Sequence, residues 1–326
     1  VRGSSFNDVI NGTAGSDWLW GEGGHDRISG LHGDDLVGGD AGDDFLQGGP
    51  GYDFVDYYYA TGPVDVSLVL RDSYGDGVDR LSGFQGIVGS EYDDILVGNS
   101  DHNSFQALGG NDTVTGGGGL DWMVFADGPV RADLGTGTAR GEGRDRFSEI
   151  EALAGSDEDD ILVGSDGNDA LDGWGGNDVL NGKEGDDYLI GDEGDDRIDG
   201  GAGSYDLVEF FAAASITADL RAGTASGEGA DELVGIEGLA GSVLGDVLIG
   251  NDSANFLFGN GGDDRIEGGG GDDMLDAGEG IDALIGGDGS DDCFGAESSS
   301  ACEGARPIRQ HPLFVSDDNF YKIRFH

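Results

Sequence analysis

Aspartate recurs at every ninth position through the first part of this chain. The stretch from Gly12 to Asp56 divides into five blocks of nine residues, and the sixth place of each block is Asp. Asp8 belongs to the same series one block earlier. Like charges repeated at one fixed point of a regular structure repel one another, so they need a cation between them. A hard ion with flexible oxygen coordination suits Asp carboxylates combined with turn carbonyls, which points to Ca²⁺.

Glycine and apolar residues keep the same phase and indicate what positions these carboxylates. In every block of this stretch Gly holds the first and fourth places, and an apolar residue holds the eighth. Gly permits positive φ and close backbone approach, so the first six residues predict a tight turn. The last three predict a short strand whose middle side chain points to one face. Such a strand buries too little to stand alone, so we expect stacked copies that bury a continuous apolar row, as in a solenoid.

The phase returns in three later runs of blocks. Across the chain it defines 21 sixth places, and every matching eighth place is apolar when Met123 and Cys293 are counted as apolar. Asn103 and Asn255 hold two of the sixth places. Because Asn offers an oxygen without charge, we expect those turns to bind a cation weakly or not at all. The other 19 are the candidate metal ligands: Asp8, Asp17, Asp26, Asp35, Asp44, Asp53, Asp94, Asp112, Asp121, Asp160, Asp169, Asp178, Asp187, Asp196, Asp246, Asp264, Asp273, Asp282 and Asp291.

Blocks such as GTAGSDWLW and GEGGHDRIS resemble the RTX (repeats-in-toxin) family of haemolysin-type calcium-binding nonapeptides. The resemblance implies an all-β fold, a right-handed parallel β-roll or β-helix solenoid in which two nonapeptides make one turn. It implies Ca²⁺ ions in two rows between successive turns, with the sixth-place Asp as side-chain ligand and backbone carbonyls as most of the other ligands. It also implies a secreted bacterial protein, extracellular or on the cell surface. In the first run one edge of the roll would carry Asp8, Asp26 and Asp44, and the other Asp17, Asp35 and Asp53.

Longer segments repeat as well. Residues 130–156 and 216–242 are similar and lie 86 residues apart without a gap, and residues 64–90 are a more diverged copy. We expect these inserts to form wider coils of the same solenoid, with projecting hairpins as the alternative. Glu151 matches Glu237 but the first copy has Gln85 there, so a shared ligand role is not assigned. The predicted divisions are a first run at 1–56, three modules of insert plus nonapeptides at 57–120, 121–205 and 206–304, and a tail at 305–326 without repeats.

The chain is strongly acidic, with 67 Asp and Glu against 16 Lys and Arg and a net charge of −51. Such a surface repels nucleic acid and anionic membranes, so neither is expected as a partner. No apolar run approaches the roughly 18 residues of a membrane span. If each ion lies between turns two blocks apart, the four runs hold about a dozen Ca²⁺, which would cancel roughly half of this charge. No signal peptide is visible, so we expect a removed leader or a fragment of a longer chain.

Two cysteines stand near the end of the repeats. An even count in a secreted chain favours a disulfide between Cys293 and Cys302. They lie one block apart, on opposite sheets about 10 Å from each other. A disulfide needs Cα atoms within about 7 Å, so the bridge requires the roll to taper or leave phase. The basic and aromatic tail that follows is expected to cap the last coil or fray, with a secretion or docking signal as the alternative.

The sequence predicts no catalytic site. No HExxH, GxSxG or P-loop motif occurs, and the five His residues lie in turns or in the tail. Acid–base catalysis needs two carboxylates in contrasting environments, whereas these repeat identically. We therefore expect a structural role in adhesion, surface-layer assembly or spacing, with self-association or a cell-surface polysaccharide as the partner. The alternatives are the C-terminal calcium-dependent folding or secretion domain of a larger secreted protease, lipase or polysaccharide-modifying enzyme, and a carbohydrate-binding module using Tyr57, Tyr58, Tyr59 or Trp122.

Overall fold

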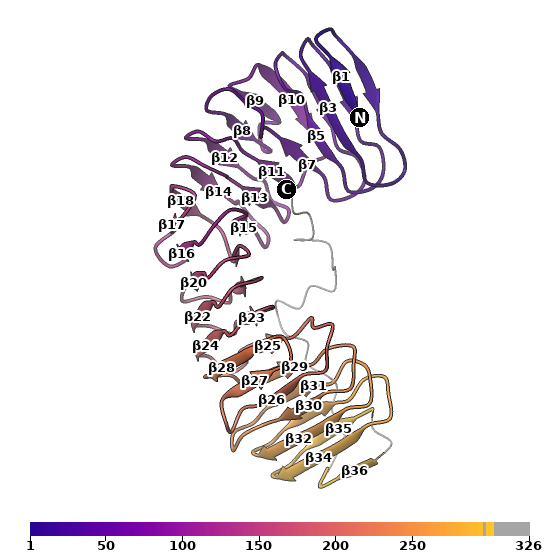
Figure 1. The fold of residues 1–326 in the computed structure, drawn as a ribbon, viewed down its shortest axis with the longest axis vertical. Coiled ribbons are helices and arrows are strands. Elements are labelled where there is room, and N and C mark those ends of the chain that lie inside the picture. The colour runs from indigo at the N-terminus through magenta and orange to yellow at the C-terminus, as the bar shows by residue number, and fades with distance from the viewer. Residues whose placement is uncertain (296–297, 303–326) are drawn as a thin grey trace. The chain divides into compact units, whose positions relative to one another are not determined.

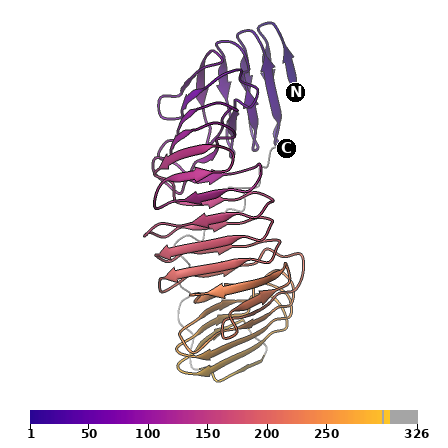
Figure 2. The ribbon, with the colours of Figure 1, turned by 60° about the vertical axis from the view of Figure 1, so that its left-hand side comes forward.

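The computed structural model describes residues 1–295 and 298–302, and in them every regular element is a β-strand. The chain forms two compact units, one from Val1 to Ala154 and one that starts at Gly155. Figures 1 and 2 show the strands of each unit stacked coil upon coil. No helix in these ranges is long and apolar enough to cross a membrane.

Successive blocks place their strands alternately in two sheets, here called sheet A and sheet B. In sheet A, β3 (Trp18–Glu22) pairs in parallel with β5 (Leu36–Gly38), and Leu19 lies beside Val37. In sheet B, β4 (Arg27–Ser29) pairs in parallel with β6 (Phe45–Gln47), and Ile28 lies beside Leu46. Two nonapeptides therefore make one coil, and the expected parallel β-roll is confirmed.

In unit 1 the strands of sheet A, in spatial order, are β1 (Arg2–Ser4), β3, β5, β7 (Phe54–Asp56), β11 (Gly86–Val88), β13 (Ser104–Gln106), β15 (Trp122–Val124) and β19 (Ala152–Ala154). Those of sheet B are β2 (Val9–Asn11), β4, β6, β10 (Val78–Ser82), β9 (Asp72–Tyr74), β8 (Asp65–Ser67), β12 (Ile95–Val97), β14 (Thr113–Thr115), β18 (Arg144–Ser148), β17 (Thr138–Arg140) and β16 (Arg131–Asp133).

In unit 2 the strands of sheet A are β21 (Ala170–Asp172), β23 (Tyr188–Ile190), β25 (Leu207–Glu209), β29 (Gly238–Ala240), β31 (Phe256–Phe258), β33 (Met274–Asp276) and β35 (Asp292–Phe294). Those of sheet B are β20 (Ile161–Val163), β22 (Val179–Glu184), β24 (Arg197–Ala202), β28 (Ala230–Val234), β27 (Thr224–Ser226), β26 (Thr217–Asp219), β30 (Val247–Ile249), β32 (Arg265–Gly270), β34 (Ala283–Asp288) and β36 (Ser298–Ser300).

The eighth-place side chains form the core between the two sheets. From Ile10 to Leu284 all of those predicted are buried, and most have no exposed surface. Phe105 and Met123 are among the largest fully buried side chains. Each such side chain contributes about 1.5–3 kcal/mol when it is removed from water, so the phased apolar row supplies the cohesion of the roll.

The three inserts are wider coils and not projecting hairpins. In the first, β8, β9 and β10 run antiparallel to one another inside sheet B. Their outer members pair in parallel with the nonapeptide strands β6 and β12, while sheet A advances by a single strand from β7 to β11. The inward residue of the middle strand is small in each copy: Ser73, Ala139 and Ala225.

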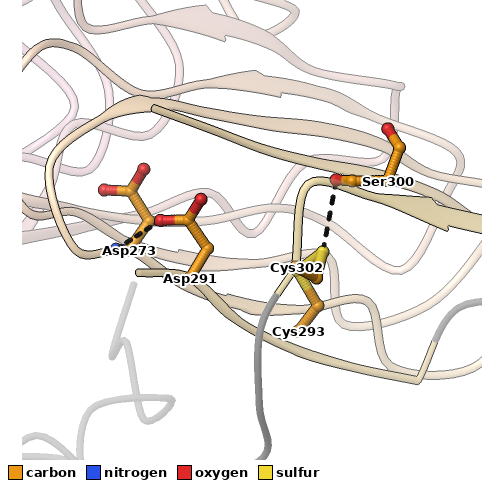
Figure 3. Close-up of a disulfide and its surroundings, with 5 residues drawn as sticks. All are labelled: Asp273, Asp291, Cys293, Ser300 and Cys302. Carbon is orange, nitrogen blue, oxygen red and sulfur yellow. Dashed lines mark hydrogen bonds between the residues drawn. A yellow bond between two sulfur atoms is a disulfide. The ribbon is translucent and has the colours of Figure 1, made fainter. Parts of the chain in front are cut away.

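The roll leaves phase at its last described coil. Continued nine-residue counting places Cys302 at the next inward position, but in the structure Ser299 lies beside Leu284 there, so that count was wrong. The shift brings Cys302 to Cys293 with a Cα–Cα distance of 5.8 Å, and the predicted disulfide forms (Figure 3). The predicted tail at 305–326 lies outside the described residues.

Candidate metal sites

The sixth-place side chains form a ladder along each edge of the roll. The backbone amide of Asp8 donates to Oδ1 of Asp26 at 2.7 Å, and that of Asp26 donates to Oδ1 of Asp44 at 2.6 Å. On the other edge the amide of Asp17 donates to Oδ1 of Asp35 at 2.8 Å. The same step recurs through every run in both units, and Figure 3 shows the one between Asp273 and Asp291. One carboxylate oxygen of the accepting Asp thus holds two coils in register at each step.

The second oxygen of these carboxylates has no such partner in the later coils of each run. A buried carboxylate oxygen without a hydrogen bond is strongly unfavourable, so each one is a candidate cation site. In the part of the chain that the structure describes, Oδ2 is buried without a hydrogen-bond partner at Asp26, Asp35, Asp44, Asp53, Asp121, Asp178, Asp187, Asp196, Asp206, Asp264, Asp273 and Asp291.

The first carboxylates of a run differ, because a hydroxyl residue at the second place of the block satisfies Oδ2. The amide of Ser4 and its hydroxyl donate to Oδ2 of Asp8 at 2.7 and 2.8 Å, and Ser242 makes the same contacts with Asp246. Predicted ligands held in this way by Ser or Thr are Asp8, Asp17, Asp94, Asp160, Asp169 and Asp246. The start of each run is therefore closed by protein donors.

The two Asn positions are also closed by protein groups. The amide nitrogen Nδ2 of Asn103 donates to the carbonyl of Gln85 at 3.0 Å, and its Oδ1 accepts from the amide of Asn99. Asn255 makes the equivalent bonds at the same point of its module. At both positions an N–H group of Asn therefore points toward the neighbouring carbonyl, where Asp would present a carboxylate oxygen. This geometry favours the expected weak or absent cation binding at the two Asn positions.

Burial raises the pKa of several ladder carboxyl groups well above the usual value for Asp. It raises the pKa of Asp44 and Asp187 to about 7 and the pKa of Asp178 to about 8. Repulsion from neighbouring ladder carboxylates adds to the rise, while the backbone amide bond opposes it. Without a cation the ladder therefore holds protons near neutral pH, and a divalent ion would displace them.

Backbone carbonyls share the space into which Oδ2 points. A Cβ built on Gly182, at the first place of its block, would overlap Oδ2 of Asp187 and lie 2.6 Å from the carbonyl oxygen of Gly200 in the next coil. Among residues 1–295 and 298–302 no three His, Cys, Asp or Glu side chains gather as a metal site. The carboxylate oxygen and the carbonyl oxygens that share this space are hard oxygen donors of the kind that suits Ca²⁺.

The ladders continue through the inserts, which the nine-residue phase misses. Oδ1 of Asp79, Asp145 and Asp231 accepts the amide of the preceding ladder residue in sheet B. In sheet A the carboxamide of Gln85 and the carboxylates of Glu151 and Glu237 accept the same bond, although the sequence comparison assigned them no shared role. Asp206 accepts from Asp187 after a block with one extra residue. The signal that finds all of these is a polar residue two places before a buried apolar one, as in Asp206 and Val208.

Two of the four aromatic residues considered as a carbohydrate platform are inaccessible. Tyr57 and Trp122 are buried, which overturns that part of the expectation. Tyr58 and Tyr59 are exposed, but their rings stand edge to face at 87° rather than side by side in one plane.

Fold and sites together define a calcium-binding β-roll. The family model of the RTX calcium-binding nonapeptide repeat matches residues 2–37, 31–55, 88–123, 154–189, 175–207, 241–275 and 267–298. These segments cover more than half of the chain, so the chain belongs to this family. The parts left unmatched between them contain the three antiparallel inserts. No curated protein matches the chain.

Proposed function

We propose that this chain is a structural module of a secreted bacterial protein that folds as Ca²⁺ fills its two ladders. The observation that carries the proposal is the buried, unpartnered Oδ2 that recurs coil after coil, in Asp26 and Asp44 on one edge and in Asp35 and Asp53 on the other. Burying a carboxylate oxygen without a partner costs free energy, so a fold that does so at every coil needs a ligand at every coil. About a dozen ions would serve the described coils.

Electrostatic repulsion between the ladder carboxylates opposes folding, and bound ions have to offset it. Two unit charges 5 Å apart repel by about 0.8 kcal/mol in water and by roughly 3 kcal/mol at an effective dielectric of 20. That repulsion recurs at every ladder step, such as the one from Asp178 to Asp196. Each block buries only one apolar side chain in the core. Bound Ca²⁺ supplies the positive charge between the coils. The sixth-place Asp and the carbonyl of the first-place Gly would hold it, and the backbone amides keep the carboxylates aligned.

An extracellular, non-enzymatic role is supported by several features of the chain. The disulfide between Cys293 and Cys302 suits an oxidising compartment. The net charge of −51 disfavours nucleic acid and anionic membranes as partners. The unpartnered ladder carboxylates of a run repeat in one environment, whereas acid–base catalysis requires two carboxylates in contrasting ones. A spacer, adhesive or surface-assembly role fits, and a place at the C-terminal side of a secreted enzyme is the rival.

The test is a calcium titration of the chelated 326-residue chain, followed by far-UV circular dichroism and small-angle scattering. We expect an expanded chain without calcium and a cooperative gain of β signal and compactness as calcium returns, because each ion ties neighbouring coils. A full β signal that persists in excess chelator and does not change on adding calcium would defeat the proposal. Turnover of a peptide, lipid or polysaccharide by the purified chain, lost on a point substitution that spares folding, would favour the enzymatic rival.

A further inference from the structure

Four arginines stand together on the outer face of sheet B in the second insert. Arg131 on β16, Arg140 on β17 and Arg144 and Arg146 on β18 are all exposed, and the three strands lie side by side (Figure 1). Arg140 is directly opposite Arg131 on one side and directly opposite Arg144 on the other. These residues, here called the arginine patch, are four of the 16 Lys and Arg residues in a chain whose net charge is −51.

The arginine patch has no carboxylate partner in the protein. In the part of the chain that the structure describes, the arginines that form ion pairs are Arg2, Arg197, Arg221 and Arg265, and none of them belongs to the patch. The acidic residue beside the patch, Asp133, lies opposite Thr138, and its Oδ1 accepts the amide of Thr136 at 2.9 Å. Like charges directly opposite each other on neighbouring strands are destabilising. The row of arginines therefore carries a repulsion that these neighbours do not offset.

The fold does not require arginine at these places. The third insert has the same antiparallel strands in the same register, and there the residues corresponding to Arg131, Arg140, Arg144 and Arg146 are Thr217, Ser226, Ala230 and Glu232. In the first insert the corresponding residues are Asp65, Tyr74, Val78 and Arg80. Neutral or mixed side chains therefore form the same wide coil, and the row of three opposed arginines is specific to the second insert.

A row of guanidinium groups suits a ligand that repeats its acidic groups. Each guanidinium can donate two parallel hydrogen bonds to a carboxylate, or to a tetrahedral anion such as phosphate or sulfate. Neighbouring strands lie about 4.8 Å apart, so Arg144, Arg140 and Arg131 present three such groups over about 10 Å. Thr113 and Thr138 lie on either side of Arg146 in the next row and expose hydroxyl groups. A single small anion would engage one arginine, whereas a linear polyanion engages the whole row.

The surroundings of the arginine patch favour a thin partner. The chain as a whole is acidic, so a broad polyanion such as a DNA duplex, or a second copy of this chain, would bring negative charge over repelling surfaces. Exposed charges are largely screened from one another beyond about 8–10 Å at physiological ionic strength, so one thin chain on the patch interacts mainly with the arginines. Single-stranded nucleic acid is held by aromatic side chains on which its bases stack. The two described rows, Arg144–Arg140–Arg131 and Thr113–Arg146–Thr138–Asp133, contain no aromatic residue.

We propose that the arginine patch binds an acidic polysaccharide, a linear glycan that carries carboxylate or sulfate groups. Arg131, Arg140 and Arg144 hold successive acidic groups, and the threonine hydroxyls bond to sugar hydroxyls beside them. The inference rests on the proposed calcium-dependent folding and gives the adhesive role a partner. Between Arg144 and Arg146 lies the buried Asp145, whose Oδ1 accepts the amide of Asp112 in the ladder. The coil that carries the patch is thus built on the ladder, and binding requires the folded roll.

The test is isothermal titration of the calcium-loaded 326-residue chain with dextran sulfate, with hyaluronate, whose acidic groups are carboxylates, and with neutral dextran. We expect dextran sulfate, hyaluronate or both to bind, and to bind more weakly as salt is added, whereas neutral dextran does not bind. The triple variant Arg131→Thr, Arg140→Ser, Arg144→Ala installs the residues of the third insert, so it should keep the fold. We expect it to weaken binding by roughly tenfold, because three exposed charge pairs are lost together.

The matched control removes the same amount of charge from arginines that already form ion pairs, in the triple variant Arg197→Thr, Arg221→Ser, Arg265→Ala. It should change the affinity by less than about twofold, because those guanidinium groups are engaged by carboxylates. Equal weakening in the two triple variants would overturn the proposal, since net charge alone would then explain the binding. Tighter binding of a DNA duplex than of either polysaccharide, or self-association that is lost in the first triple variant, would overturn it as well.

Circular dichroism of the same samples separates this inference from the proposed function. A chain that shows its full β signal in calcium, and loses it in chelator, but binds neither acidic polysaccharide would overturn the arginine patch as a binding site and leave calcium-dependent folding intact. A chain without β signal in calcium would overturn both.

Thermal unfolding distinguishes ligand binding from a structural role of the arginines. Without polysaccharide, the variant of the arginine patch should unfold in calcium at the same temperature as the unsubstituted chain or slightly higher, because the repulsion between opposed arginines is removed. The polysaccharide that binds should raise the unfolding temperature of the unsubstituted chain and of the control variant, but not that of the patch variant. A patch variant that unfolds at a lower temperature, yet is stabilised by the polysaccharide as much as the unsubstituted chain, would show that these arginines serve the fold and not a ligand.

Discussion

The backbone amide of Asp178 donates a hydrogen bond of 2.8 Å to Oδ1 of Asp196 one coil further along, while Oδ2 of each carboxylate is buried without a hydrogen-bond partner. One oxygen therefore serves the register of the coils and the other is left for an ion. Loss of such a side chain removes a structural bond and a ligand together. The two effects can be separated at Asp8, whose Oδ2 is already satisfied by Ser4 and is not left for an ion.

We expect Asp178→Ala to raise the calcium concentration at the folding midpoint and Asp8→Ala to change it much less. Asp178 lies in the middle of its ladder, and its Oδ1 accepts the amide of Asp160. Loss of a hydrogen bond to a charged group costs about 1.5–3 kcal/mol. Asp8 is half-buried at the start of its run, and Ser4 already satisfies its Oδ2. Calcium titrations followed by circular dichroism give both midpoints, and equal shifts would contradict the expected difference.

A substitution of glycine at the first place of a block should block an ion site without removing a carboxylate. In Gly182→Ala the new methyl group would overlap Oδ2 of Asp187 and crowd the carbonyl of Gly200, so we expect a loss of about 1–3 kcal/mol as for other overpacked sites. Gly15→Ala is the matched control, because a Cβ there meets nothing within 4 Å and should change stability by less than about 0.5 kcal/mol. Thermal unfolding in saturating calcium measures both. A Gly182→Ala protein as stable as the control would show that the space beside Oδ2 is not needed.

The nine-residue phase was sufficient to predict the roll, its core and most of the ladder. Gly, Asp and an apolar residue at fixed places specify a turn, a ladder carboxylate and a buried strand, so Leu19 was placed correctly in the core and Asp26 at a fixed point of every second block. The disulfide was also predictable, since two inward cysteines one block apart pair only if the chain leaves phase. The structure shows how, because the backbone of Ser299 pairs beside Leu284 and Cys302 comes three residues later.

The nine-residue phase failed to predict some ladder residues for one physical reason. The ladder counts strands in space, whereas the sequence pattern counts residues along the chain. In the first insert the chain crosses sheet B three times, so Asp44 donates to Asp79, 35 residues away, and not to a residue 18 away. In unit 2 one additional residue before Asp206 shifts the phase.

The metal-free roll should be more stable at mildly acidic pH than at neutral or basic pH. The folded-state pKa values of Asp44 and Asp178 are raised to about 7 and about 8 from the usual 3.8. Between these limits the folded chain binds more protons than the unfolded chain, so its stability is greatest at the acidic end and is lost as pH rises through about 6 to 8. Circular dichroism of calcium-free protein should therefore show more β signal at pH 5.5 than at pH 8. More β signal at pH 8 than at pH 5.5 would contradict the predicted direction of the pH dependence.

Replacing a ladder asparagine by aspartate should create an ion site. Asn255 is fully buried, its Nδ2 donates to the carbonyl of Glu237 at 3.2 Å and its Oδ1 accepts from the amide of Asn251 at 2.7 Å. In Asn255→Asp an oxygen replaces the donor and faces the carbonyl without a hydrogen between them, which is unfavourable unless a cation enters. We therefore expect an additional bound Ca²⁺ at saturation and a lower stability in chelator.

The control for this gain is Asn11→Asp, which adds the same charge at an exposed position on β2. It should leave both the calcium stoichiometry and the stability in chelator unchanged, because its new carboxylate remains hydrated. Equilibrium dialysis with metal analysis measures the bound ions, and circular dichroism confirms that each variant is folded in calcium. A folded Asn255→Asp protein that binds no more calcium than Asn11→Asp would mean that a ladder carboxylate alone does not define a site. The carbonyls of the surrounding coils, whose positions the substitution leaves unchanged, would then decide where the ions bind.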